Sequence, residues 1–148
     1  MTNRELKSKV VSLGNRLAPR MGGDKSAAFA RAWQIVKAGS LELAVKGTSF
    51  GKRQEALKRL ATYPQDQIRA VLVPEENNPA DKNAIAVLVG VNGGKGLFHL
   101  GYAPRELAPV LTAMRGLHTL QFPALRVVSG TWGWAQKTTF GARVAIGV

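Results

Sequence analysis

The chain has 148 residues, of which 45% are hydrophobic, a composition that fits one folded domain with an appendage and excludes a disordered chain. It contains no cysteine, which excludes disulfides and thiolate metal sites. Its 21 Lys and Arg residues against nine Asp and Glu residues give a net charge of +12, which favours a polyanionic partner, above all nucleic acid. The competing interpretations of this charge are general solubility and contact with an acidic protein.

No run of residues approaches the roughly 18 apolar positions that a membrane span requires, so no membrane partner is expected. The first residues, MTNRE, lack the apolar core of a secretory signal. The sequence therefore predicts a cytoplasmic protein.

Residues 1–40 carry eight basic and two acidic residues, a net charge of +6, and are the most densely charged part of the chain. Apolar residues recur every three or four positions along residues 3–18, which predicts a helix with one apolar face. The same spacing resumes after Asp24 or Ser26, either of which can cap a second helix, and stops before Gly39, a residue typical of helix C-termini. We therefore predict a basic helical hairpin as an N-terminal domain that docks on the rest of the chain or on a partner.

The remaining domain, residues 41–148, is predicted to be mainly β-structure with two short helices. A period of two favours a strand at the start, and Pro, Gly and Asn punctuate the elements that follow. The expected strands are residues 41–45, 67–74, 83–91, 97–102, 119–130 and 138–148, and the expected helices are residues 52–63 and 104–116. Pro109 indicates a kink or a late start in the second helix. The pattern favours a small, partly open β-barrel of the SH3 or OB type.

The stretch NNPADKN, residues 77–83, is too rich in turn-forming residues for a plain hairpin and predicts a loop of defined shape. Pro79 fixes its own backbone, and the Asn and Asp side chains bond to nearby backbone groups. An ionised Asp81 repels a phosphate but accepts a hydrogen bond from a hydroxyl, which suits a sensor of a strand end. The alternative interpretation is that Asp81 and Asn83 only stabilise the loop.

The order of these motifs resembles that of the HIRAN domain family over about residues 41–146. The resemblance rests on Gly47, on Asn78-Pro79 with the stretch DKNA at residues 81–84, and on the stretches GY and PRE at residues 101–102 and 104–106. It implies a small barrel that binds single-stranded DNA at a free 3′ end.

Carried over by position, the resemblance implies that Phe50 stacks on the terminal base and that Asp81 contacts the 3′-hydroxyl. It places Lys82 beside a phosphate and Tyr102 in the lining of the same pocket. One position departs from the family pattern, because Ala80 stands where an aromatic residue often precedes the aspartate. That change removes a stacking surface typically worth about 1–3 kcal/mol per base.

Other residues are candidate DNA contacts because of their positive charge or their aromatic ring. Lys46, Lys52 and Arg53 surround Phe50 and are predicted to form a basic rim for phosphates. Arg105, at a helix start, is either a solvated charge or a further phosphate contact. Trp132 and Trp134 share a face by alternation and either stack on bases or cover the N-terminal helices.

Nothing in the sequence indicates catalysis or a cofactor. His99 and His118 are isolated, and the stretch VNGGKG has the wrong spacing for a phosphate-binding loop. Glu75, Glu76 and Asp81 carry the carboxylates that Mg²⁺ prefers, but the adjacent Glu75 and Glu76 point to opposite faces of an extended segment, which disfavours a shared metal site. The sequence therefore predicts a binding protein that is not an enzyme and has no cofactor.

Two alternatives to DNA-end binding stay open. One is a protein-interaction adaptor, of a phage type, in which the barrel is a scaffold and Phe29 and Trp33 belong to a docking face on residues 1–40. The other is RNA binding, because aromatic stacking does not itself distinguish the sugars.

Overall fold

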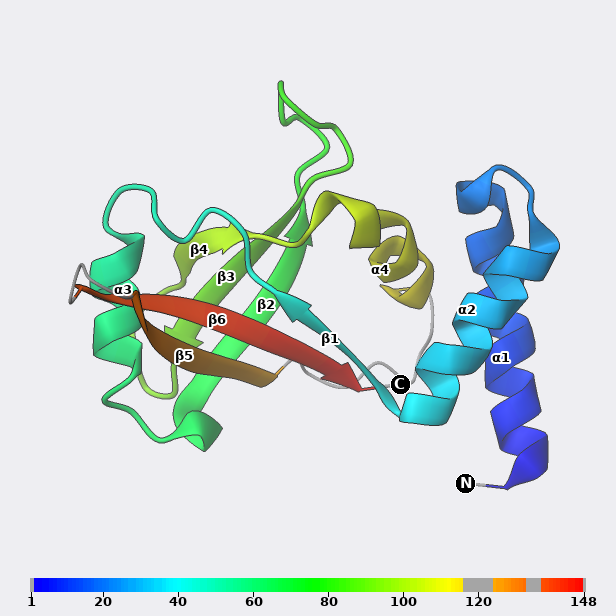
Figure 1. Ribbon diagram of the computed structural model, residues 1–148, viewed down its shortest axis with the longest axis horizontal. Helices are drawn as coiled ribbons and strands as arrows, with labels where there is room; N and C mark the ends of the chain where they lie inside the picture. Colours follow the sequence, from blue (N-terminus) through cyan, green and yellow to red (C-terminus); the bar gives the residue numbers. More distant parts are fainter. Residues whose placement is uncertain (1, 116–123, 133–136, 148) are drawn as a thin grey trace. The chain divides into compact units, whose positions relative to one another are not determined.

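The computed structural model describes residues 2–115, 124–132 and 137–147 (Figure 1). The chain divides into two compact units. The helical unit comprises Met1–Leu41, Glu106–Gln121 and Ile146–Val148, and the sheet unit comprises Glu42–Arg105 and Phe122–Ala145. The domain boundary at residue 40 stays a prediction.

The helical unit begins with the predicted pair of helices, α1 (Asn3–Leu17) and α2 (Lys25–Ala38), joined through a 3₁₀ turn at Ala18–Met21. Thr2 and Glu5 form a reciprocal capping box at the start of α1, with hydrogen bonds of 2.9 and 3.2 Å. Asp24 caps α2, and Gly39 ends it in the left-handed conformation at φ +79°, which glycine adopts without strain. Both ends of α2 therefore confirm the sequence prediction.

The two helices approach closely because Gly14 has no side chain. A Cβ at Gly14 would lie 2.9 Å from the ring of Phe29, so the ring occupies that space. Small and aliphatic residues fill the rest of the contact, and α1 also packs on α4 (Ala108–Arg115). Trp33 is 41% exposed because Ala32, Ile35 and Val36 take the buried positions around it.

Two antiparallel three-stranded sheets form the β-structure (Figure 1). In the first sheet, β3 (Ile85–Val91) lies between β2 (Ile68–Pro74) and β4 (Phe98–Tyr102), and a bulge shifts its register against β4 after Val87. In the second sheet the order is β1 (Ser40–Ala44), β6 (Lys137–Gly147) and β5 (Ala124–Trp132). The first four strands and β6 therefore lie within a few residues of the predicted ranges. The last predicted strand but one, residues 119–130, agrees with β5 from Ala124 onwards, whereas residues 119–123 lie outside the described residues and β5 continues to Trp132.

The prediction of a partly open barrel holds in part, because the two sheets do not close into a barrel. Within the described residues, the only strand pairing between the two sheets is an isolated bridge from Lys46, just beyond β1, to Tyr102 of β4. The fold is a mixed α/β arrangement of two sheets. Residues from both sheets and from α3 (Arg53–Leu60) supply the largest fully buried side chains of the sheet unit, namely Leu43, Leu57, Val87, Leu100, Leu125 and Val144.

The proline in the second predicted helix delays its start. A 3₁₀ turn at Arg105–Leu107 precedes α4, so Pro109 occupies the second position of the α-helix, where its missing N–H has no partner to lose. This late start was one of the two predicted outcomes. No helix in the described part of the chain is long and apolar enough to span a bilayer.

Candidate functional site

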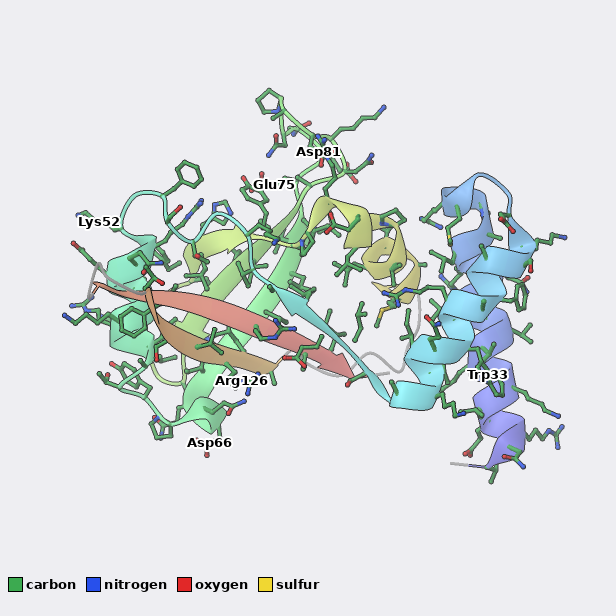
Figure 2. The ribbon with its side chains drawn as sticks, viewed as in Figure 1. Trp33, Lys52, Asp66, Glu75, Asp81 and Arg126 are labelled. Carbon is green, nitrogen blue, oxygen red and sulfur yellow. The ribbon has the colours of Figure 1, made fainter. Side chains whose placement is uncertain are left out.

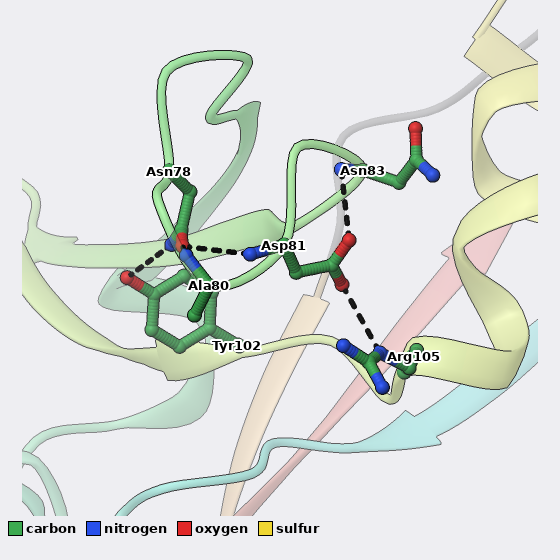
Figure 3. Close-up of polar contacts among 6 residues, drawn as sticks. All are labelled: Asn78, Ala80, Asp81, Asn83, Tyr102 and Arg105. Carbon is green, nitrogen blue, oxygen red and sulfur yellow. Dashed lines mark hydrogen bonds and ion pairs between the residues drawn. The ribbon is translucent and has the colours of Figure 1, made fainter.

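The NNPADKN stretch forms the centre of a loop between β2 and β3, which we call the Asn78 loop (residues 75–84). The Asn78 side-chain oxygen accepts hydrogen bonds from the backbone N–H groups of Ala80 at 2.9 Å and Asp81 at 3.1 Å (Figure 3). At the base of the loop, the N–H of Glu75 donates to the carbonyl of Ala84 at 2.8 Å. The loop therefore has the defined shape that its composition predicted, and Asn78 imposes much of it.

The Asp81 carboxylate is held by two partners. One oxygen accepts from the Asn83 N–H at 2.9 Å, and the other lies 3.4 Å from Nε of Arg105 (Figure 3). The Asp81 side chain is 23% exposed and that of Arg105 is 78% exposed, so the pair lies at the surface. A carboxylate has about four acceptor positions, and these contacts use two of them. The loop-stabilising role of Asp81 is thus present, while a ligand contact stays a prediction.

Glu75 and Tyr102 form a second polar cluster beneath the loop. The Tyr102 hydroxyl and the Asn78 amide both donate to the same Glu75 oxygen, each at 3.0 Å. The Asn78 hydrogen bond lowers the pKa of Glu75, burial opposes it, and the Tyr102 hydroxyl adds to the lowering. Burial and the Glu75 carboxylate together raise the pKa of Tyr102. An ionised Glu75 therefore holds a neutral tyrosine.

Sequence reasoning missed this role of Glu75, which it considered only as a metal ligand. Glu75 lies at the end of β2, near the base of the loop, whereas Asp81 lies farther along it (Figure 2). Its partner Tyr102 is 27 positions away in the sequence, and no local signal marks their contact. In the described residues, no group of three or more His, Cys, Asp or Glu residues is placed to hold a metal ion.

Phe50 lies on the turn between β1 and α3, with 68% of its surface exposed. Gly47 opens this turn at φ +78°, and its carbonyl accepts a 2.7 Å hydrogen bond from the Arg53 guanidinium. Gln54 also donates to the Thr48 carbonyl at 3.0 Å. The turn is therefore fixed by side chains of α3 while the Phe50 ring faces solvent.

The bridge between Lys46 and Tyr102 connects the Phe50 turn to the end of β4. The two residues exchange backbone hydrogen bonds of 2.7 and 2.9 Å. A Cβ at Gly101 would collide with the Lys46 carbonyl oxygen, so glycine at this position is what permits the pairing. The bridge brings together the neighbourhoods of Phe50 and Tyr102, which the sequence separates by about 50 residues.

The predicted basic residues have different surroundings. Lys46, Lys52 and Lys82 are exposed, whereas Arg53 is half-buried and shapes the turn through Gly47. Arg105 is committed to Asp81 on one side of its guanidinium. Trp134 and the Trp132 side chain lie outside the described residues, so the stacking hypothesis for them stays a prediction.

A hollow of about 590 Å³ lies beside the Asn78 loop. We call it the loop hollow, and it is lined by Pro74, Glu75, Glu76, Asn77, Asn78, Pro79 and Tyr102. Two of these residues are acidic, which disfavours a phosphate inside the hollow. Amide, carboxylate and phenol groups instead suit hydroxyl groups and base edges.

A small two-sheet module with a fixed polar loop and an exposed aromatic turn, in a chain whose net charge is +12, has the features of a recognition module for a polyanion. The family model of the HIRAN domain matches residues 38–136, which is most of the chain. The chain therefore belongs to the HIRAN domain family, as the motif order predicted. HIRAN domains bind nucleic acid, which supports the predicted class of partner.

Two solved structures are similar to the chain. The crystal structure of the HIRAN domain of human HLTF is 23% identical, with a TM-score of 0.37, and the match covers 74% of this chain and 76% of that one. A protein from Lactobacillus plantarum is 18% identical, with a TM-score of 0.31, over 74% of this chain and all of that one. No curated protein matches the chain significantly.

Proposed function

We propose that the chain captures single-stranded DNA at a 3′-hydroxyl end, between the Phe50 turn and the Asn78 loop. The observation that carries the proposal is the Lys46–Tyr102 bridge, which connects the Phe50 turn to β4. From β4 the Tyr102 hydroxyl donates to Glu75 at the base of the Asn78 loop, the loop that presents the oriented Asp81 carboxylate. In this arrangement the terminal base stacks on Phe50, and the terminal hydroxyl donates to a free acceptor position of Asp81.

The charges of the site support a preference for a hydroxyl over a phosphate at the strand end. A 3′-phosphate would place its charge beside Asp81 and Glu75, and the lowered pKa of Glu75 keeps that residue ionised near neutral pH. Internal phosphates lie farther from these carboxylates and within reach of the exposed Lys46, Lys52 and Lys82. Arg105 keeps most of its surface accessible while it orients Asp81 and is a further phosphate contact in this proposal.

The test is fluorescence anisotropy on labelled single strands that end in a 3′-hydroxyl or a 3′-phosphate, and on a circular strand, at two salt concentrations. We expect the hydroxyl end to bind most tightly and all affinities to fall steeply with salt. Asp81→Asn keeps a hydrogen-bond acceptor at this position but removes the negative charge. It should therefore reduce the difference in affinity between strands that end in a 3′-hydroxyl and strands that end in a 3′-phosphate. Equal binding of all three strands by the native chain would contradict the proposal.

A second candidate function follows from the helical unit. Trp33 is 41% exposed and Val11 is 50% exposed on a pair of helices with a net positive sequence. This surface fits the protein-adaptor hypothesis, and the basic residues around it fit additional contacts to duplex DNA. Trp33→Ser distinguishes the protein-adaptor role from the duplex-DNA role. Loss of binding to a protein partner at high salt would indicate apolar docking, whereas a loss confined to duplex DNA at low salt would indicate a nucleic-acid contact.

A further inference from the structure

A second hollow, of about 610 Å³, runs along α3 in the sheet unit. We call it the α3 hollow. Its walls are Lys52, Glu55, Ala56, Lys58, Arg59 and Thr62 from α3 and its flanks, together with Phe98 at the start of β4. It shares no lining residue with the loop hollow.

The α3 hollow combines free cations with an exposed ring. Among the described residues, no carboxylate lies within ion-pair distance of Lys52, Lys58 or Arg59, and Glu55 is the one acidic residue in the walls. Phe98 is 40% exposed although it belongs to a strand of the sheet. Unpaired cations around an accessible aromatic ring are the combination that binds single-stranded nucleic acid without sequence preference.

The hollow also continues from the proposed end site. Lys52 is the N-cap of α3 and follows Phe50 by two positions. Positions 52, 55, 56 and 59 lie on one side of α3, because residues three or four positions apart are neighbours on a helix surface, and Thr62 follows the end of the helix. At a rise of about 1.5 Å per residue the eight residues of α3 span about 12 Å, which matches three to four stacked nucleotides at about 3.4 Å each.

We propose that the α3 hollow holds the part of the DNA strand that lies 5′ to the captured end. One base stacks on Phe98, and phosphates lie between Lys52, Lys58 and Arg59. The inference rests on the proposed function, because the captured end sets the strand's register. It adds a second stacking position beyond Phe50 and predicts how many nucleotides the binding site holds.

The experiment compares oligothymidylates of about three and about eight nucleotides, each with a 3′-hydroxyl or a 3′-phosphate, using the full chain. We expect the longer strand to bind the native chain more tightly. Phe98→Ala should weaken the longer strand about tenfold and leave the shorter strand unchanged. Phe98→Tyr keeps the ring and should restore the affinity. Tyr63→Ala is the matched control, because Tyr63 is 44% exposed and does not line the α3 hollow.

The outcomes for the two proposals are distinguishable. A retained hydroxyl preference together with unchanged long-strand binding by Phe98→Ala overturns the α3 inference alone. A long-strand loss in Phe98→Ala without any hydroxyl preference supports the α3 hollow as a DNA contact and refutes end capture. Absence of binding to every strand overturns both.

Discussion

Gly101→Ala tests the connection between the Phe50 turn and β4. The new Cβ would collide with the Lys46 carbonyl oxygen and would also lie 2.8 Å from a methyl group of Val45. Both of these neighbours belong to the segment beyond β1, so the segment must move away from β4. The two backbone hydrogen bonds of the bridge are then lost, at about 1 kcal/mol each. Overpacking adds about 1–3 kcal/mol.

The sum predicts that the free energy of unfolding falls by about 3–5 kcal/mol. The assay is urea denaturation followed by far-UV circular dichroism. Gly141→Ala is the matched control, because it is also a strand glycine but its Cβ would meet only a Val128 methyl group, at 3.3 Å. A loss below about 1 kcal/mol in Gly101→Ala would show that the bridge does not hold the two sheets together.

Three further predictions concern the loop and the turn. Asn78→Ala removes the acceptor for two backbone N–H groups and a donor to Glu75. It should therefore lower the free energy of unfolding by about 2–3 kcal/mol in the same denaturation assay. An unchanged free energy of unfolding would mean that Pro79 alone determines the shape of the loop. Phe50→Ala should weaken single-strand binding by about 1–3 kcal/mol and leave stability unchanged, because the ring is 68% exposed; equal affinity by anisotropy would reject stacking there. Because the folded-state pKa of Glu75 lies below its unfolded value, its contribution to stability is complete above the unfolded pKa and is lost as pH falls through the folded pKa. Glu75→Gln should therefore flatten the decline in thermal stability below about pH 5, and an identical decline in both proteins would contradict this assignment.

The sequence predicted the features that local chemistry determines. Helical spacing located α1 and α2, and the caps at Asp24 and Gly39 lie next to the residues that they satisfy. Asn78 shapes its loop through bonds to residues two and three positions away, which is why composition alone indicated a fixed loop. Pro109 delays the start of α4, the helix that contains it, so its effect could also be predicted from the local sequence.

The features that the sequence did not predict depend on residues far apart along the chain. The Arg105–Asp81 ion pair spans 24 positions, and the fixation of Tyr102 by Glu75 spans 27. The sequence also did not predict that the Arg53 guanidinium donates to the Gly47 carbonyl, and a phosphate contact by Arg53 stays a prediction. The division of the strands into two separate sheets likewise depends on which strand edges meet, and the alternation of residues within one strand carries no information on that pairing.

The Asn78 loop has a kinetic consequence. Its hydrogen bonds come from its own residues and from Tyr102 and Arg105, so its shape exists before any DNA arrives. A preformed loop leaves little conformational entropy to lose on association, and binding needs no slow ordering step. With a net charge of +12 guiding the encounter, the association rate constant should be high and should fall with salt. Differences in affinity among strand ends should then reside in the lifetime of the complex, since the end groups act only after contact.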